Sequence, residues 1–251
     1  MIKKNQSGFT LIEILVMLPV VSFIITVLVV LAQRSYYTIL ANNAETNLNL
    51  EAQTILFPLQ DELLFATDYA DTISSTLADP FAPTGGWRHD SDPQTLIVYE
   101  TTLDKPRRDP DRDFVYKRDY ACGSYYSPYN PIATDNIIYF MKPNTDNDYY
   151  TLRRRILTPQ YATCGTNYRP QTCPSTANFG TGGCQKVDTV LSDHVIDFEV
   201  NYFDENNNQI DLSNGGSPLS AEKLTIKLKL GNRILGKTVD ATSTISMRKI
   251  N

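Results

Sequence analysis

The stretch that decides the fold is residues 9–32, "FTLIEILVMLPVVSFIITVLVVLA", which contains a single charged side chain, Glu13. As a helix rising about 1.5 Å per residue, it would be roughly 36 Å long, enough to cross a hydrocarbon core of about 30 Å. No second segment of this kind follows. The sequence therefore predicts one transmembrane helix and one large polar part, residues 33–251.

The flanking charges predict how this helix is oriented. Lys3, Lys4 and the α-amino group precede it, whereas only Arg34 follows before the next charged residue, Glu45. The positive-inside rule then places the first residues in the cytoplasm and the polar part outside. All four cysteines lie in that outer part, in agreement with a compartment that permits disulfides.

The order of residues before the helix differs from that of a secretory signal peptide. In a signal peptide an apolar stretch of about 7–15 residues precedes the small residue at the cleavage site. Here the small residue, Gly8, comes first. Cleavage after Gly8 would remove a polar leader, residues 1–8, and would leave Phe9 as the first residue of an intact hydrophobic helix.

Glu13 needs an explanation, because a carboxylate inside a membrane costs about 2.5–3.5 kcal/mol on insertion scales unless it is paired or protonated. Cleavage would create a cation, the α-ammonium of Phe9, about 6 Å away along the helix axis. The ammonium of a neighbouring copy or homologue could serve instead and would fix the axial register of packed helices. A tolerated acid near the end of a signal anchor is the alternative that spacing leaves open.

The N-terminal residues resemble the class III signal of type IV pilins and type II secretion pseudopilins. The matching residues are Lys3, Lys4, Gly8, Phe9, Thr10, Leu11, Ile12 and Glu13. The resemblance implies that a prepilin peptidase cuts after Gly8 and methylates Phe9, and that Glu13 is needed for assembly. Pro19 departs from the family, whose helix-bending proline lies further along, and is expected to kink the span.

Residues 33–65 predict that the helix continues beyond the membrane as an amphipathic stalk. There is no glycine in this segment, and Pro58 is expected to bend the helix near its end. Apolar residues recur at spacings of three and four and form one stripe for burial: Leu40, Ala41, Ala44, Leu48, Ala52, Ile55, Leu56, Leu59 and Leu63.

The remainder, residues 66–251, predicts a globular head built around an antiparallel sheet. Residues 66–134 look irregular apart from a strand at 95–101, and residues 135–251 look β-rich. Further strands are expected at 136–142 and 149–157, which would form a hairpin with a half-exposed second strand, and at 195–203, 224–230 and 238–247, each with one buried and one exposed face. The fold class is α+β, with the upper stalk helix packed on the sheet.

The C-terminal part resembles the larger minor pilins, of the pseudopilin J and minor pilin W type. The resemblance is carried by "IIYFMKPNTDNDYYTLRRR", "LSDHVIDFEVNYFDENNN" and "STISMRKIN", and it leaves residues 66–134 without a counterpart. It implies a pilin-like fold, a rare subunit and a location at the filament tip.

The spacing of the cysteines favours disulfides over zinc, because zinc sites require closely spaced pairs. Three pairings of four cysteines are possible. Cys173–Cys184 would close a glycine-rich segment. Cys122–Cys164 would tie residues 66–134 to the loop that follows the 136–157 hairpin.

Neither a catalytic nor a cofactor site is expected. The segment "DENNNQID" begins like a calcium loop at Asp204, Asn206 and Asn208, but the glycine and the bidentate acid of such a loop are absent. A polar turn is therefore favoured, with calcium as the alternative. His89 is expected in a solvated loop and His194 at the surface, and no nucleophile elbow or nucleotide loop is present.

The charge balance argues against a nucleic-acid-binding surface. Without residues 1–8 the chain carries 21 basic and 28 acidic side chains. Arg107, Arg108 and Arg112 could contact phosphates, but the acids interleaved with them favour a self-neutralised loop. These acids are Asp104, Asp109, Asp111 and Asp113.

Together with the resemblance, these patterns predict a structural subunit and no enzyme. The resemblance implies that the chain waits as a single-pass protein in the cytoplasmic membrane, loses its leader and joins an extracellular pilus or pseudopilus. Its partners would be the prepilin peptidase and, through the N-terminal helix, other minor and major pilins. It would help to initiate assembly or cap the tip. The alternative is a tip adhesin or DNA-uptake receptor that binds its ligand through residues 66–134.

Overall fold

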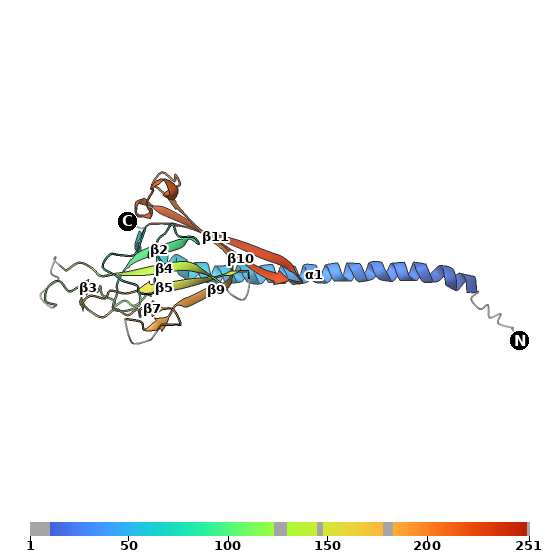
Figure 1. Cartoon of the computed structure of the whole chain (residues 1–251), viewed down its shortest axis with the longest axis horizontal. Coiled ribbons are helices and arrows are strands. Elements are labelled where there is room, and N and C mark those ends of the chain that lie inside the picture. The colour runs from blue at the N-terminus through green and yellow to red at the C-terminus, as the bar shows by residue number, and fades with distance from the viewer. Residues whose placement is uncertain (1–10, 123–129, 145–147, 178–182, 250–251) are drawn as a thin grey trace.

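A computed structural model describes residues 11–122, 130–144, 148–177 and 183–249. It consists of one long helix and a head that packs against the upper half of that helix (Figure 1). The helix packs on an antiparallel sheet, which confirms the α+β class and the order of helix and sheet expected from the sequence.

Helix α1 (Leu11–Leu63) is continuous over 53 residues. Its lower half projects from the head as a rod, and its upper half lies against the sheet (Figure 1). Pro19 and Pro58 both lie inside the helix, so neither residue ends it. No glycine interrupts residues 11–63, so the lower and upper halves form one element.

The main sheet has seven strands, and every neighbouring pair in it is antiparallel. Their order across the sheet is β1 (Ala66–Tyr69), β2 (Thr95–Thr101), β4 (Thr134–Pro143), β5 (Tyr150–Leu157), β9 (Thr189–Phe203), β10 (Lys223–Ile234) and β11 (Lys237–Arg248). The five further strands expected from the sequence are all present. Residues 66–134, however, supply both β1 and β2, so this segment is part of the sheet and not only an irregular insert.

Two small strand pairs lie at the end of the head that is farthest from the rod. Strand β3 (Tyr116–Lys117) pairs antiparallel with β6 (Thr163–Cys164), and β7 (Thr172–Cys173) pairs in parallel with β8 (Lys186–Val187). Two short 3₁₀ helices, η1 (Leu212–Asn214) and η2 (Pro218–Ser220), lie between β9 and β10. Disulfides join Cys122 to Cys164 and Cys173 to Cys184.

The core lies between the upper half of α1 and one face of the sheet. The buried helix residues are Ala44, Leu48, Ala52, Ile55, Leu56, Leu59 and Leu63. They meet sheet side chains such as Phe198 and Tyr202. The stripe expected from the sequence is therefore the buried one, except that Leu40 and Ala41, nearer the rod, are only half-buried.

The opposite face of the sheet is also covered over β2, β4 and β5, which corrects the expectation of a half-exposed strand at residues 149–157. The segment between β1 and β2 folds over this face and places Trp87 against Phe140 on β4. Arg155 of β5, expected to face water, is consequently only 2% exposed. A proline- and aspartate-rich segment covers an apolar surface here, which local composition does not predict.

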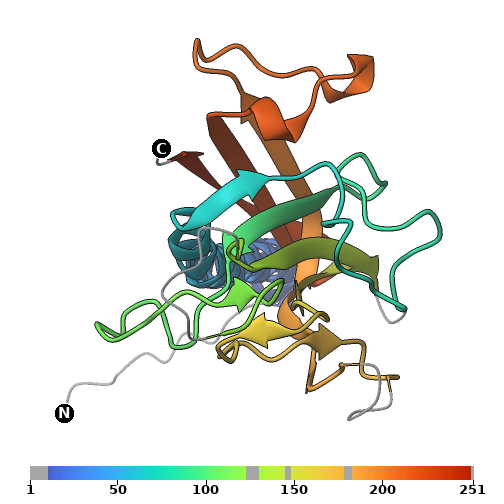
Figure 2. The ribbon, with the colours of Figure 1, turned by 90° about the vertical axis from the view of Figure 1, so that its left-hand side faces the viewer.

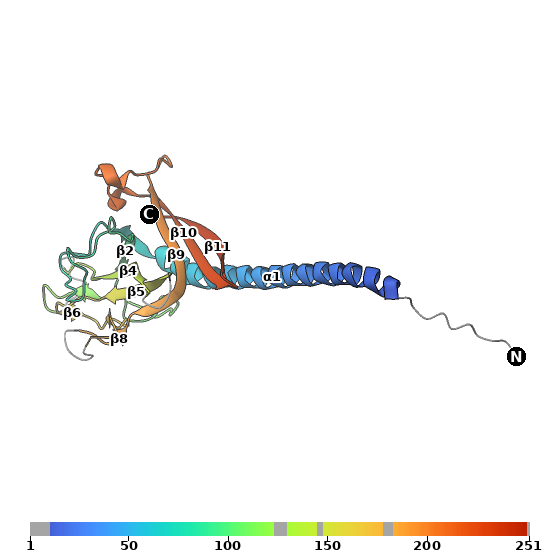
Figure 3. The same cartoon turned by 45° about the vertical axis from the view of Figure 1, so that its right-hand side comes forward.

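The sheet splays between β5 and β9. Strands β9, β10 and β11 rise away from the helix, whereas β2, β4 and β5 run nearly along it (Figures 2 and 3). The pairing of β9 with β5 ends at Val195 opposite Tyr150, although β9 continues to Phe203 beside β10. Beyond Val195, the edge of β9 that faces β5 therefore has no neighbouring strand in the sheet.

Candidate functional site

The lower half of α1 is an apolar surface that the head does not cover. Every residue from Leu11 to Tyr36 is exposed. This helix is long and apolar enough to cross a membrane, and none of its most apolar window is buried. Exposed leucine, isoleucine and valine side chains on this scale are unfavourable in water, so the helix is a candidate membrane anchor or signal sequence.

Glu13 lies in the first turn of the described helix. The predicted cleavage site and the predicted methylated residue, Gly8 and Phe9, lie outside the described residues. The distance from Glu13 to the α-ammonium of Phe9 therefore stays a prediction.

The upper half of α1 carries a second apolar stripe, which sequence reasoning missed. Ile39, Leu50 and Phe57 are 58%, 57% and 63% exposed. At 3.6 residues per turn they lie almost opposite the stripe buried against the sheet. The three residues are eleven and seven positions apart, which is a helical spacing that the sequence shows. The stripe is difficult to recognise there because it is sparse and mixed with polar residues.

An ion pair anchors the upper end of α1 to the sheet. Arg154 of β5 donates to Glu62 through Nε, at 2.8 Å from Oε2, and through a second, shorter bond from Nη2 to Oε1. Tyr139 of β4 donates its hydroxyl to the same carboxylate. Burial, followed by the charge of Glu62, raises the pKa of Tyr139 well above its ordinary value. Tyr139 therefore remains a neutral donor.

Two further arginines approach the same helix end from the loop after β2. Arg107 donates to the backbone carbonyl of Asp61 at 3.0 Å and pairs with buried Glu100, and Arg108 pairs with the Asp61 carboxylate at 2.7 Å. The loop was expected to be neutralised by its own acids. Arg112 does stay within the loop, but it donates to the backbone carbonyl of Asp109 and not to a carboxylate. Arg107 and Arg108 form their ion pairs with acids outside the loop, Glu100 and Asp61.

A buried charged cluster holds the outer layer on the sheet. Arg155 pairs with Asp79 at 2.8 Å and with Asp188 at 2.5 Å, and its guanidinium lies 5.2 Å from the ring centroid of Trp87. All three charged side chains are 3% exposed or less. These pairs join the segment between β1 and β2 to β5 and to the residue before β9, so they tie the outer layer to the sheet.

A second buried cluster joins β2 and β4 to the loop before β7. Arg169 pairs with Glu100 at 2.7 Å and lies 3.6 Å from Asp135, whose other oxygen accepts hydrogen bonds from Thr102 and Asn167. Burial raises the pKa of Asp135 to about 6, against the opposing effect of Arg169. The cluster thus contains a carboxyl group that titrates in mildly acidic solution.

The two histidines differ in their surroundings. His89 was expected in a solvated loop, but it is 7% exposed, and its Nδ1 lies 3.6 Å from the Asp71 carboxylate. The expectation failed because the polar neighbours of His89 face outward while the segment itself packs on the sheet. His194 is half-buried in β9, with Nδ1 3.2 Å from Asp193 and 3.7 Å from Glu51 on α1.

The residues of the calcium alternative form a hydrogen-bonded turn. Asp204 accepts bonds from the backbone of Asn206 and Asn208 at 2.9 and 2.8 Å, and from the Asn208 side chain at 3.0 Å. The Asn208 bonds lower the pKa of Asp204. Within the described part of the chain, no group of three or more histidine, cysteine or acidic side chains is placed to hold a metal ion.

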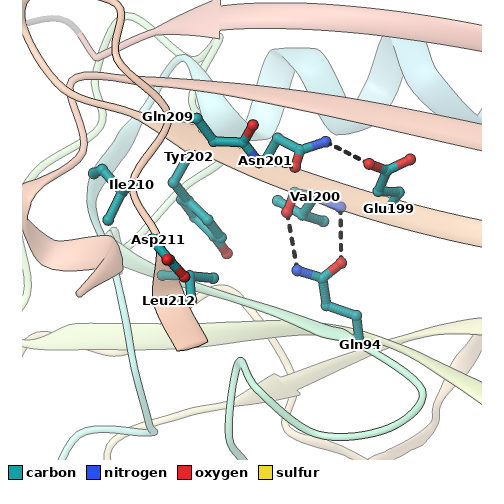
Figure 4. A pocket seen from close by; sticks show the side chains of 9 residues that line it. All are labelled: Gln94, Glu199, Val200, Asn201, Tyr202, Gln209, Ile210, Asp211 and Leu212. Atoms are coloured by element: carbon teal, nitrogen blue, oxygen red, sulfur yellow. Dashed lines mark hydrogen bonds between the residues drawn. The ribbon is translucent and has the colours of Figure 1, made fainter. Parts of the chain in front are cut away.

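A pocket of about 410 Å³ opens where the sheet splays (Figure 4). Gln94, from the loop before β2, points across it to β9. Its amide donates to the carbonyl oxygen of Val200 and accepts from the Val200 N–H, both at 2.9 Å. Tyr202, Ile210 and Leu212 form the apolar part of the lining, and Glu199 and Asp211 form the acidic part.

Comparison with known proteins adds no neighbour to this description: no family model, curated protein or solved structure matches the chain.

Proposed function

We propose that this protein is a minor pilin or pseudopilin, a structural subunit that initiates assembly or caps the tip of a type IV pilus or a related filament. The observation that carries the proposal is the exposed apolar half of α1, which is continuous with the helix that anchors the head. The order Gly8, Phe9, Thr10, Leu11, Ile12, Glu13 supports a leader that is cut off while the helix remains.

In this proposal α1 changes its surroundings from lipid to other helices. Before assembly, residues 9–32 span the cytoplasmic membrane. After assembly, the same surface packs among the helices of other minor and major pilins. Such packing requires an apolar surface around the whole helix, which is what the exposed residues of the rod provide.

Glu13 would set the axial position of the incoming helix. A carboxylate in an apolar bundle needs a cation, and the processed N-terminus of this or a neighbouring chain supplies one. A mismatch by one helical turn would separate the charges by a further 5.4 Å or so. The pair would therefore favour one register.

The second apolar stripe extends the contact surface beyond the membrane. Ile39, Leu50 and Phe57 face away from the sheet, so the upper half of α1 presents one stripe to its own head and another outward. A monomer gains nothing from the outward stripe. In a filament it would lie against a neighbouring helix or head.

The test measures the incorporation of the chain into filaments sheared from cells that assemble them. The E13A chain and the L50E/F57E chain should remain in the membrane fraction, and mass spectrometry of the mature wild-type chain should find methylated Phe9 at the N-terminus. L219E is the matched control, because Leu219 is 47% exposed on the head, far from α1, and this variant should enter filaments normally. Normal incorporation of E13A, or a mature chain that keeps Met1, would contradict the proposal.

The receptor alternative needs a narrower test than deletion of residues 66–134. That segment supplies β1 and β2 and contributes Asp79 and Glu100 to the buried charged clusters. Its removal would unfold the head and abolish every function at once. Only surface substitutions that leave these residues intact could separate ligand binding from assembly.

A further inference from the structure

The open edge of β9 is a candidate binding surface on the head, independent of the rod. The partner strand on the β5 side ends at the Val195–Tyr150 pair, whereas pairing with β10 continues from Val195 to Phe203. An unpaired strand edge presents N–H and C=O groups that can pair with another chain.

The direction of the free backbone groups follows from the alternation of an antiparallel ladder. Val200 directs its N–H and C=O away from β10, because both bond to Gln94. Tyr202 directs its C=O to the same side, where it accepts from Ile210 N–H at 2.8 Å. Because every second residue of a strand faces the same side, the N–H and C=O of Phe198 also point into the opening.

Gln94 already occupies this edge in the way that a strand residue would. A primary amide offers one donor and one acceptor side by side, which is the pattern of a peptide group. By bonding both groups of Val200, the side chain satisfies one position of the edge (Figure 4). Along β9, the next residue whose backbone groups face this edge is Phe198, towards the part of β9 that pairs with β5.

There is room for a peptide on both sides of Gln94. The pocket of about 410 Å³ lies on the Tyr202 side, and a second pocket of about 360 Å³ lies on the Phe198 side, where Met141 and Tyr150 also line it. The acidic residues among the lining are Asp92, Asp197, Glu199 and Asp211, and no lysine or arginine lines either pocket in the described chain.

Strand β10 shows which side chains suit this face of β9. On its paired side, Glu199 is opposite Lys227, with 3.2 Å between the charged atoms, and Asp197 is opposite Lys229. The residue between them, Leu228, is opposite Phe198 and faces the core. Lysines thus alternate with an apolar residue in the existing neighbour of β9.

We propose that the free edge of β9 around Phe198, next to the position that Gln94 occupies, binds an extended, basic segment of a partner protein by strand addition. The peptide backbone pairs with Phe198, its apolar residues face Phe198 and Met141, and its lysines or arginines face Asp197 and Glu199. Directly opposed residues of neighbouring strands lie on the same face of a sheet, so this alternation is required by geometry.

The probe is a fluorescent eight-residue peptide that alternates lysine and valine. Its binding to the full chain is measured by anisotropy, with the chain held in uncharged phosphatidylcholine nanodiscs. Two control peptides have the same composition: one groups the lysines at one end, and one carries N-methyl groups on alternate peptide bonds. We expect binding of the alternating peptide and a loss of at least tenfold in affinity for both controls.

The variant D197N/E199Q tests the charge complementarity, and D111N is its matched control on a distant exposed loop. Two partly exposed ion pairs predict a loss of roughly 2- to 30-fold for the first variant and no change for the second. Hydrogen exchange should show protection at residues 196–203 when the probe is bound.

Three results would overturn the proposal. The first is equal binding of the N-methylated peptide, which would mean electrostatic adsorption only. The second is protection from hydrogen exchange at the other sheet edge, β11, in place of β9. The third is the absence of binding. None of these results bears on filament incorporation. The proposed assembly function and this inference therefore fail separately.

Discussion

Breaking the Glu62–Arg154 pair should uncouple the head from α1. The substitution R154M leaves the Glu62 carboxylate and the Tyr139 hydroxyl facing an apolar side chain. Both members of the pair are only 18% exposed. Removing one partner of a buried pair costs about 3–5 kcal/mol. The residual exposure lets water reach the carboxylate, so we expect a loss of about 3 kcal/mol in the free energy of unfolding.

The assay is urea unfolding of the full chain in a zwitterionic detergent, followed by the fluorescence of Trp87. This residue is the only tryptophan and is 5% exposed in the outer layer of the head. With an m-value of about 2 kcal/mol/M, R154M should lower the urea midpoint by about 1.5 M. E62Q should have a similar effect. The double variant should lose about 2 kcal/mol less than the sum of the single losses.

The matched control is R108M, which breaks the other ion pair at the same helix end. Arg108 and Asp61 are 90% and 55% exposed, so their pair should contribute less than about 1 kcal/mol. An R154M midpoint no lower than that of R108M would refute the reasoning, because burial would then make no difference. Additive single effects would refute it too, because the two side chains would not interact.

Two further predictions concern the head. The pKa of Asp135 rises from its usual 3.8 to about 6 on folding, mainly through burial, so the folded head binds this proton more tightly than the unfolded chain does. As the pH rises from about 4 to 6, the free energy of unfolding of wild type should therefore fall by about 3 kcal/mol relative to that of D135N. Urea midpoints measured across this pH range test this, and parallel profiles for the two proteins would contradict it. The loops closed by Cys122–Cys164 and Cys173–Cys184 span 42 and 11 residues. The corresponding double serine variants should lose up to about 4 and 3 kcal/mol in thermal or urea unfolding, and the reverse order would count against a loop-entropy origin.

Periodic patterns were enough to predict the scaffold. The alternation of "LTIKLKL" in β10 and the stripe from Ala44 to Leu63 reflect burial on one face, which a strand or helix repeats every two or about 3.6 residues. Such signals are local, so they can be recognised in one chain. The strand at residues 95–101 was predicted at its observed bounds from another local signal, its β-branched and aromatic residues.

The polar contacts could not be predicted in this way. Glu62 and Arg154 are 92 residues apart, and Arg155 and Asp79 are 76 apart. No local spacing relates them. Arg154 and Arg155 are adjacent and of the same type, yet Arg154 binds the helix end and Arg155 the outer layer, because successive side chains of a strand point to opposite faces. The alternation at residues 149–157 was correctly taken as that of a strand. The segment that covers its second face is distant in the sequence and was not predicted.

The distribution of charge at the end of α1 explains why helix and head form one unit. The last turn contains Asp61 and Glu62 and no basic residue. Because a helix C-terminus carries partial negative charge, two carboxylates there destabilise an isolated helix. The compensating cations, Arg107, Arg108 and Arg154, all belong to the head. The upper helix therefore reaches full stability only when the head is folded around it. In the proposed filament, a force on the rod would then be carried to the sheet through Glu62 and the buried stripe.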